Sequence, residues 1–137
     1  MTIFRRAELR DLPAIAAIQA ASPEAAQWEI SAYLQDEILL AVSDGSVAGF
    51  LVARAAGEDE CDLLNLAVAP EHRRKGIGRG LVGSFLNSRH GAVFLEVRES
   101  NQAARGFYKF MGFQEVKVRV QYYQSPPESG IVMKFFS

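Results

Sequence analysis

Apolar residues along the first half of the chain follow a pattern that changes from alternating to helical and back. Leu12, Ile15 and Ile18 lie three residues apart, which is the spacing of one helix face. Asp11 before them is a typical N-cap residue, and Pro13 suits a first helical turn. This half predicts a strand over residues 2–6, helices over 12–21 and 24–35, and strands over 38–42, 47–55 and 62–68. Short polar turns join the last three strands, so we expect an antiparallel meander.

In the second half, helix and strand patterns follow one another. A polar, basic connection over residues 69–75 leads into a helix that starts at Gly76 and ends at His90-Gly91. The remaining pattern predicts a strand over 92–97, a helix over 101–111, and strands over 113–123 and 131–136 around a Ser125-Pro126-Pro127 loop. A strand, a crossover helix and a strand in succession favour a parallel, right-handed unit. We expect residues 1–137 to form one α+β domain with a mixed sheet.

Composition excludes several classes of protein. At 137 residues, 49% hydrophobic and 10% aromatic, the chain is long and apolar enough for one domain with a sizeable core. Fifteen basic and sixteen acidic residues leave a net charge of −1, which gives no general attraction to nucleic acid or to an anionic membrane. Cys61 is a single cysteine and forms no internal disulfide. The charged N-terminus does not resemble a signal peptide, so we expect a soluble, cytoplasmic protein.

The most informative stretch is glycine-rich and basic: residues 73–80 read Arg-Arg-Lys-Gly-Ile-Gly-Arg-Gly. Glycines at a helix start let backbone N–H groups approach a ligand, and the helix dipole favours phosphate there. Basic side chains lie in the same stretch, at Arg73, Arg74, Lys75 and Arg79. We interpret the stretch as a pyrophosphate site. The alternative is a solvated basic turn whose glycines serve packing.

Common nucleotide signatures do not explain this stretch. Residues 78–83 match the dinucleotide pattern GxGxxG, and Glu96 follows about one strand later. In that fold, however, the first glycine comes directly after the first strand, whereas here a basic loop intervenes. The nucleotide-binding pattern GxxxxGK(S/T) does not occur in the sequence. A dinucleotide-binding protein therefore remains only a distant alternative.

Arg73-x-x-Gly76-x-Gly78, preceded by residues 64–70 (Leu-Asn-Leu-Ala-Val-Ala-Pro), resembles the acetyl-CoA motif of the GNAT acyltransferase superfamily. The resemblance implies the GNAT fold, with a central sheet of about six to seven strands and about four helices. It implies acetyl-CoA as co-substrate and no metal; His72 and His90 do not have metal-ligand spacing. The residues expected at the coenzyme are Leu66, Ala67, Val68, Arg73, Arg74, Lys75, Gly76, Ile77, Gly78, Arg79, Asn101 and Ala104.

A narrower resemblance lies further along the chain. Residues 95–101 (Leu-Glu-Val-Arg-Glu-Ser-Asn), with Ala104 and Tyr108 after them, are similar to the bacterial ribosomal-protein-alanine N-acetyltransferases, which acetylate protein α-amino groups. The resemblance implies that Glu96 is the general base and that Tyr108 protonates the leaving thiolate. It places Asn101 at the pantetheine and an oxyanion-binding N–H near residues 66–68. Without it, Glu96 would be interpreted as an ion-paired strand residue and Tyr108 as core.

The acceptor region departs from that family. Residues 26–29 (Ala-Gln-Trp-Glu) replace its Pro-Trp-Ser segment, and Tyr122-Tyr123-Gln124 replaces Tyr-Tyr-Pro. Trp28 and Tyr122 are the candidate substrate-binding residues, with a core position as the alternative for Trp28. A protein N-terminal α-amine, such as alanine of a ribosomal protein, is the expected acceptor. The alternatives are a lysine, a small-molecule amine, or a coenzyme-A-binding module without catalysis.

Overall fold

The computed structural model describes residues 1–124 and 126–136, which form seven strands, three α-helices and three short 3-10 helices. The packing divides the chain into two compact units. The first unit comprises Met1–Ala55 and Leu63–Arg89, and the second comprises Ala56–Asp62 and His90–Ser137. Strands β3 (Ser46–Gly57) and β4 (Glu60–Val68) have residues in both units, and the turn that joins them belongs to the second.

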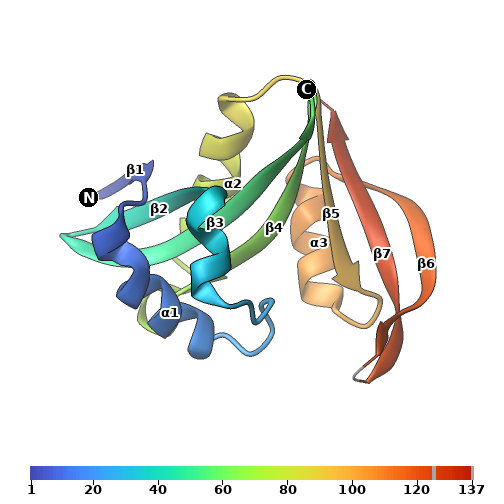
Figure 1. Cartoon of the computed structure of the whole chain (residues 1–137), viewed down its shortest axis with the longest axis horizontal. Coiled ribbons are helices and arrows are strands. Elements are labelled where there is room, and N and C mark those ends of the chain that lie inside the picture. The colour runs from blue at the N-terminus through green and yellow to red at the C-terminus, as the bar shows by residue number, and fades with distance from the viewer. Residues whose placement is uncertain (125, 137) are drawn as a thin grey trace. The chain divides into compact units, whose positions relative to one another are not determined.

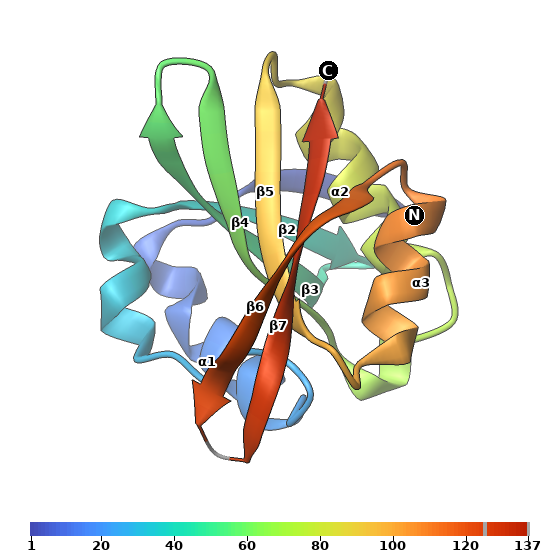
Figure 2. The same cartoon turned by 90° about the vertical axis from the view of Figure 1, so that its right-hand side faces the viewer.

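The first unit contains the strand order β1-β2-β3-β4. β1 (Thr2–Arg6) pairs antiparallel with β2 (Glu37–Ser43), and β2 pairs antiparallel with β3. Helices α1 (Leu12–Ala20) and α2 (Ile77–Asn87) lie on opposite faces of these strands (Figure 1 and Figure 2). The strands are thus covered from both sides, which explains the nearly continuous apolar runs of β2 and β3.

Apolar side chains fill both faces of this first sheet region. On one face, Ile15 of α1 packs in a cluster with Leu40 of β2 and Phe50 of β3. On the other, Leu81 and Phe85 of α2 are almost completely buried. The apolar spacing seen in the sequence therefore marks the buried faces of both helices.

The second unit has the strand order β4-β5-β7-β6. β5 (Ala92–Arg98) runs parallel to the beginning of β4, and their described register ends at Asp62 and Phe94. β7 (Pro127–Phe136) pairs antiparallel with β5 on one side and with β6 (Gln114–Gln124) on the other. Helix α3 (Gln102–Phe110) lies beside these strands in Figure 2. The predicted antiparallel meander and the predicted parallel strand–helix–strand unit are both confirmed.

The prediction of a helix over residues 24–35 is wrong. Residues 23–25 turn and bend, residues 26–29 have no regular structure, and Ile30–Gln35 is a 3-10 helix. The described part of the chain therefore has three α-helices instead of about four. Tertiary hydrogen bonds favour the observed path: the Asn65 side chain accepts from the Ala26 N–H and donates to the Ala26 C=O, and a helix would need that C=O internally.

Strand ends differ from the predictions by a few residues. β7 begins at Pro127 instead of Ile131, and Pro127 pairs with Gln124. Proline is tolerated at the first residue of a strand, because its missing N–H removes little from the ladder there. Ser125, which the sequence places in the preceding loop, lies outside the described residues. None of the described helices is both long and apolar enough to cross a membrane.

Candidate active site

The turn before α2 contains two residues of positive φ. Arg74 has φ +63° and Gly76 has φ +78°, and α2 begins directly afterwards at Ile77. The Gly80 N–H donates to the Gly76 carbonyl at 2.9 Å, which closes the first helical turn. The N–H groups of Ile77 and Gly78 belong to the first turn of α2, so the helix itself provides no carbonyl that accepts from them. A helix N-terminus of this kind favours an anion.

Basic side chains accompany this turn. Arg74, Lys75 and Arg79 are exposed on the surface of the first unit. Exposed cations beside N–H groups at a helix start are suited to a pyrophosphate, which carries negative charge and several acceptor oxygens. The predicted phosphate-binding stretch therefore has a fitting local geometry.

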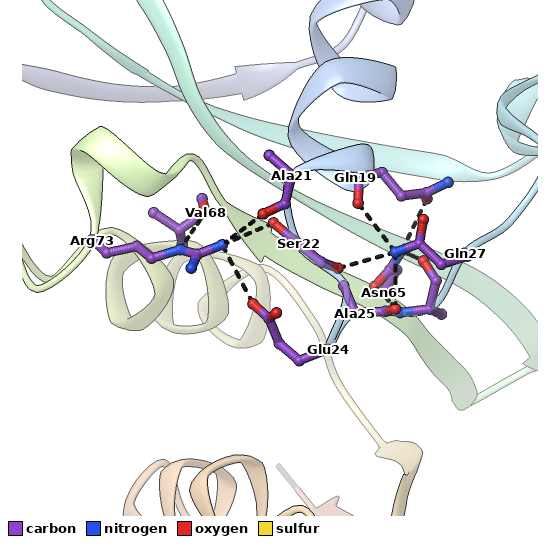
Figure 3. A network of polar contacts seen from close by, with 10 residues as sticks. Gln19, Ala21, Ser22, Glu24, Ala25, Gln27, Asn65, Val68 and Arg73 are labelled. Atoms are coloured by element: carbon purple, nitrogen blue, oxygen red, sulfur yellow. Dashed lines mark hydrogen bonds and ion pairs between the residues drawn. The ribbon is translucent and has the colours of Figure 1, made fainter. Parts of the chain in front are cut away.

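Arg73 is used differently from its neighbours. Its Nε donates to the Val68 carbonyl at 3.0 Å, and its Nη2 donates to Ser22 Oγ at 3.0 Å (Figure 3). The same guanidinium contacts the Ala21 carbonyl at 3.4 Å and forms an ion pair with Glu24 at 3.3 Å. In this structure the Arg73 side chain ties the turn to the segment after α1. Arg73 is thus engaged by protein acceptors through both Nε and Nη2.

The segment after α1 is held by buried polar side chains. Asn65 Oδ1 accepts from the Ala26 N–H at 3.2 Å, and Asn65 Nδ2 donates to the Ala26 carbonyl at 2.8 Å. The Tyr33 hydroxyl donates to Gln19 Oε1 at 2.7 Å, and Gln19 Nε2 donates to the Trp28 carbonyl at 2.6 Å. Asn65, Gln19 and Tyr33 are all at least 94% buried. This network holds residues 26–28 in a fixed path.

Trp28 lies at the surface, with 41% of the residue exposed. Its carbonyl is anchored by Gln19, but its indole is not part of the core. The core alternative for Trp28 is therefore wrong, and the side chain is accessible to a ligand. The structure leaves the predicted substrate-binding role of Trp28 open to experiment.

The candidate oxyanion segment lies near the end of β4. Ala67 is buried, while Leu66 and Val68 are partly buried. The Leu66 N–H donates to Asn65 Oδ1 at 3.0 Å, and the Val68 carbonyl accepts from Arg73. The Leu66 N–H thus already has a partner in this structure. Residues 66–68 and the α2 turn belong to the first unit.

Glu96 belongs to the second unit, on β5. Its side chain is 18% exposed, and Oε1 accepts a hydrogen bond from Arg119 of β6 at 3.0 Å. Oε2 is buried and has no hydrogen-bond partner among the described residues. A buried carboxylate oxygen in this state is an available proton acceptor. The ion pair expected of an ordinary strand residue is present on one oxygen, and the other oxygen has no partner among the described residues.

Tyr108 lies on α3 and is 7% exposed. Its ring has edge contacts with Phe107 and Phe113, at centroid distances of 5.1 and 5.4 Å. Burial raises the pKa of the Tyr108 phenol, because the charged phenolate is poorly solvated there. At neutral pH the hydroxyl is protonated and is able to act as a hydrogen-bond or proton donor.

Asn101 forms the N-cap of α3. Its Oδ1 accepts from the Ala104 N–H at 3.1 Å, which satisfies one N–H of the first helical turn. The Asn101 side-chain oxygen is therefore used for structure. Its amide nitrogen is the group through which it would contact a coenzyme.

Tyr122 is 45% exposed on β6. The Arg119 guanidinium lies 3.8 Å from the centre of the Tyr122 ring, and Tyr123 makes an edge contact with that ring at 5.2 Å. The Tyr123 hydroxyl also approaches the Glu96 carbonyl at 3.5 Å. Arg119 thus connects the candidate base to the candidate substrate-binding tyrosine within the second unit.

Sequence reasoning missed Arg119, Gly130 and the structural use of Arg73. Gly130 gave no local signal because the predicted strand began at residue 131, and glycine marks a close approach of another group only inside a strand. No local signal marks Arg119 either, since only the pairing of strands places it beside Glu96. Within the described residues, no group of His, Cys, Asp and Glu side chains is arranged to hold a metal ion.

A family model described as the Acetyltransferase (GNAT) family matches residues 5–113. The [ribosomal protein bS18]-alanine N-acetyltransferase of Escherichia coli K12 is 34% identical over 96 residues, which is 66% of this chain and 64% of that protein. The N-alpha-acetyltransferase RimI of Mycobacterium tuberculosis is 36% identical over 86 residues, 60% of this chain and 54% of that protein. The match thus spans less than two thirds of either relative.

A solved structure shows the same fold over nearly the whole chain. The ribosomal-protein-S18-alanine N-acetyltransferase from Escherichia coli superposes with a TM-score of 0.86 at 28% identity, covering 98% of this chain and 93% of that one. The predicted α+β fold of this superfamily is therefore confirmed.

Proposed function

Because the chain belongs to the acetyltransferase (GNAT) family, we propose that it transfers the acetyl group of acetyl-CoA directly to a primary amine. The proposed acceptor is a protein N-terminal α-amine, such as the alanine of a ribosomal protein. The observation that carries the proposal is the positive-φ turn at Arg74 and Gly76, which opens the N-terminus of α2 to an anion. The names of the curated relatives support the acceptor class.

The coenzyme would be held mainly by the first unit. The N–H groups of Ile77 and Gly78 would bind the pyrophosphate, with Arg74 and Lys75 supplying positive charge. Since the Arg73 guanidinium already has protein partners, we assign it to holding the turn. On the family resemblance, we propose Asn101 as a pantetheine contact and Ala104 as a further coenzyme contact.

The second unit would supply the acid and the base. An α-amino group has a pKa near 8, so a carboxylate that removes its proton increases the reactive fraction at neutral pH. Glu96 would accept that proton, and the neutral amine would attack the thioester carbonyl. As the C–S bond breaks, the Tyr108 hydroxyl would donate a proton to the leaving thiolate. The raised pKa of Tyr108 supports this role, because the phenol keeps its proton until that step.

The acceptor contacts are proposed from exposure and position. Trp28 and Tyr122 each present a partly exposed aromatic ring, 41% and 45% exposed. Such rings contact a peptide backbone with little loss of conformational freedom. The segment that carries Trp28 differs from the family pattern, so the preferred acceptor sequence is expected to differ as well.

Two peptides test the function. One begins with a free alanine followed by basic residues; the other has a blocked N-terminus and one internal lysine. We expect mass spectrometry to find a single acetyl group on the free N-terminus only. Acetyl on the lysine alone would move the acceptor to side-chain amines, and acetyl on neither peptide, with acetyl-CoA still bound, would contradict α-amine transfer.

A matched pair of variants tests the mechanism. Glu96→Gln should lower kcat by about 10²- to 10⁴-fold, the usual contribution of a general base. Glu99→Gln, an exposed residue near the end of the same strand, should leave kcat within about twofold, because surface substitutions have small effects. Equal activity of the Glu96→Gln variant and the wild type would refute the base role.

Two parts of the proposal concern the whole chain. We propose that both units form one acetyltransferase domain, which the family match from residue 5 to 113 supports because it includes residues of each unit. We also propose a cytoplasmic location, as expected from the single cysteine.

A further inference from the structure

Gly130 occupies a strand position whose backbone conformation does not require glycine. It lies inside β7, where it pairs with Arg98 of β5 on one side and with Arg119 of β6 on the other. Its φ is not positive, so an alanine would adopt the same backbone. Glycine inside a strand is less stable than alanine, and it often marks a place where another group approaches closely.

The group that approaches Gly130 is the Glu96 carboxylate. A Cβ atom on Gly130 would overlap with Glu96 Oε2 and would lie 3.1 Å from Glu96 Cδ and 3.2 Å from Glu96 Cγ. The side chain of Glu96 therefore rests on the face of Gly130. The obstructed atoms are at the end of a flexible side chain, so an added methyl group would move the carboxylate and leave the strand in place.

Arg119 holds the other side of the same carboxylate. Cross-strand pairing puts Arg119 directly opposite Gly130, and its Nη1 donates to Glu96 Oε1 at 3.0 Å. The ring of Tyr122 lies against the guanidinium at 3.8 Å. Arg119 thus makes its contact across the space that the missing side chain of Gly130 leaves open.

We propose that Gly130 and Arg119 are positioning residues that fix the Glu96 carboxylate for proton transfer. The inference rests on the proposed base role of Glu96. Arg119 occupies Oε1, and Gly130 leaves the room in which Oε2 lies without a partner among the described residues. Oε2 then accepts the proton of the α-ammonium group: the N–H bond breaks, the amine keeps the electron pair, and an O–H bond forms on Oε2.

The Gly130→Ala variant is the main test. We expect kcat to fall by about 10- to 100-fold, because a displacement of about 1 Å is enough to lose this much in a reacting pair. The Kd for acetyl-CoA should stay within about twofold, and the melting temperature should be unchanged or higher. A kcat within about twofold of the wild type would overturn the proposal, because such a small change is what a surface substitution causes.

Gly106→Ala is the matched control. Gly106 lies on α3 in the same unit, is exposed, and has nothing within 4 Å of an added Cβ. The Gly106→Ala substitution adds the same methyl group, and we expect it to leave kcat unchanged. Equal losses of kcat in the Gly106→Ala and Gly130→Ala variants would contradict a specific role for Gly130.

Combination with Glu96→Asp shows whether Gly130 acts through Glu96. The shorter aspartate carboxylate would not reach the space beside Gly130. Glu96→Asp should therefore reduce kcat less in the Gly130→Ala background than in the wild type. The two fold-reductions should differ by a factor of at least about five, since coupled residues are non-additive. Strictly additive effects would show that Gly130 acts elsewhere.

Arg119 is tested by graded substitution. Arg119→Gln should lower kcat by about 5- to 20-fold with little change in the Kd for acetyl-CoA, while Arg119→Lys, which keeps the charge, should recover part of the loss. Equal kcat in the glutamine variant and the wild type would remove Arg119 from the proposal.

The failure of this inference is distinct from the failure of the proposed function. If Glu96→Gln is inactive while Gly130→Ala and Arg119→Gln are fully active, Glu96 is the base and only the positioning inference is wrong. If Glu96→Gln is fully active, the base role itself is wrong. A crystal structure of the Gly130→Ala variant gives a readout independent of activity: we expect the carboxylate displaced from Arg119, and an undisturbed carboxylate would contradict the inference.

Discussion

The two compact units use their polar side chains in opposite ways. In the first unit, Arg73 and Asn65 direct their side chains to main-chain groups, at Val68 and Ala26. This fixes the backbone, and the groups left for a ligand are the main-chain N–H groups at the start of α2. In the second unit, paired strands fix the backbone and the side chain of Glu96 carries the reactive atom.

This difference predicts which property of the protein a substitution in each unit changes. Replacing a buried polar side chain of the first unit should change stability or ligand affinity. Replacing a side chain of the second unit, at Glu96 or Tyr108, should change the rate of chemistry with a small effect on folding. The experiments below are arranged from the largest expected effect to the smallest.

Tyrosine-to-phenylalanine substitutions in both units give the sharpest contrast. Tyr108→Phe should lower kcat by about 10²- to 10⁴-fold, as expected on loss of a general acid. Tyr33→Phe removes the hydroxyl that bonds Gln19 in the first unit and should lower the free energy of unfolding by about 1 kcal/mol with little change in kcat. Steady-state kinetics and urea unfolding measure both. A loss of kcat in the Tyr33→Phe variant as large as in Tyr108→Phe would contradict the division between the units.

Asn65→Ala should give the largest loss of stability among these variants. It leaves the Ala26 N–H and C=O and the Leu66 N–H without their described partner. We expect the free energy of unfolding to fall by about 2–4 kcal/mol, since buried polar groups without partners are costly. Asn87→Ala, at the exposed end of α2, is the control and should stay within about 0.5 kcal/mol. Equal denaturation midpoints for the two variants would show that Asn65 does not hold the segment.

Asp11 provides a pH-dependent test within the first unit. Arg5 donates two hydrogen bonds to its carboxylate, at 2.9 and 3.0 Å, and they lower the pKa of Asp11 to about 2. Because the folded pKa lies below the unfolded value, this carboxylate adds stability above about pH 4 and loses that contribution between about pH 4 and pH 2.

Asp11→Asn should therefore lower the free energy of unfolding by about 1 kcal/mol at pH 7. The difference from the wild type should shrink as the pH falls through that range, as measured by thermal unfolding at several pH values. A difference that is constant from pH 7 to pH 2 would refute the role of the ionised carboxylate.

Arg73 and Arg74 should differ although they are adjacent. Arg74→Ala should raise the Kd for acetyl-CoA by about 3- to 10-fold at low salt, with a smaller effect at high salt, since exposed charges are screened. Arg73→Ala should mainly lower the melting temperature, because its guanidinium bonds Val68 and Ser22. Calorimetry with acetyl-CoA at two salt concentrations separates them. An equal, salt-dependent rise of Kd in both variants would return Arg73 to the phosphate site.

The sequence by itself determined the local features of this protein. The glycine-rich start of α2 and the apolar faces of α1 and α2 each depend on residues that are close in the chain. A helix-start turn and periodicity are local properties, so most of the order of elements, the fold class and the glycine-rich turn could be predicted from them. The resemblance in residues 95–108 added the candidate acid and base.

Only the tertiary structure decided how side chains distant in sequence are used. Residues 24–35 have a helical pattern, yet Asn65 bonds the Ala26 backbone and that bond competes with the helix. Arg119 and Gly130 meet Glu96 only because β7 lies between β5 and β6. The physical reason is that the partner of a side chain depends on which segments become neighbours. That choice is made by the packing of the whole chain, and no local pattern records it.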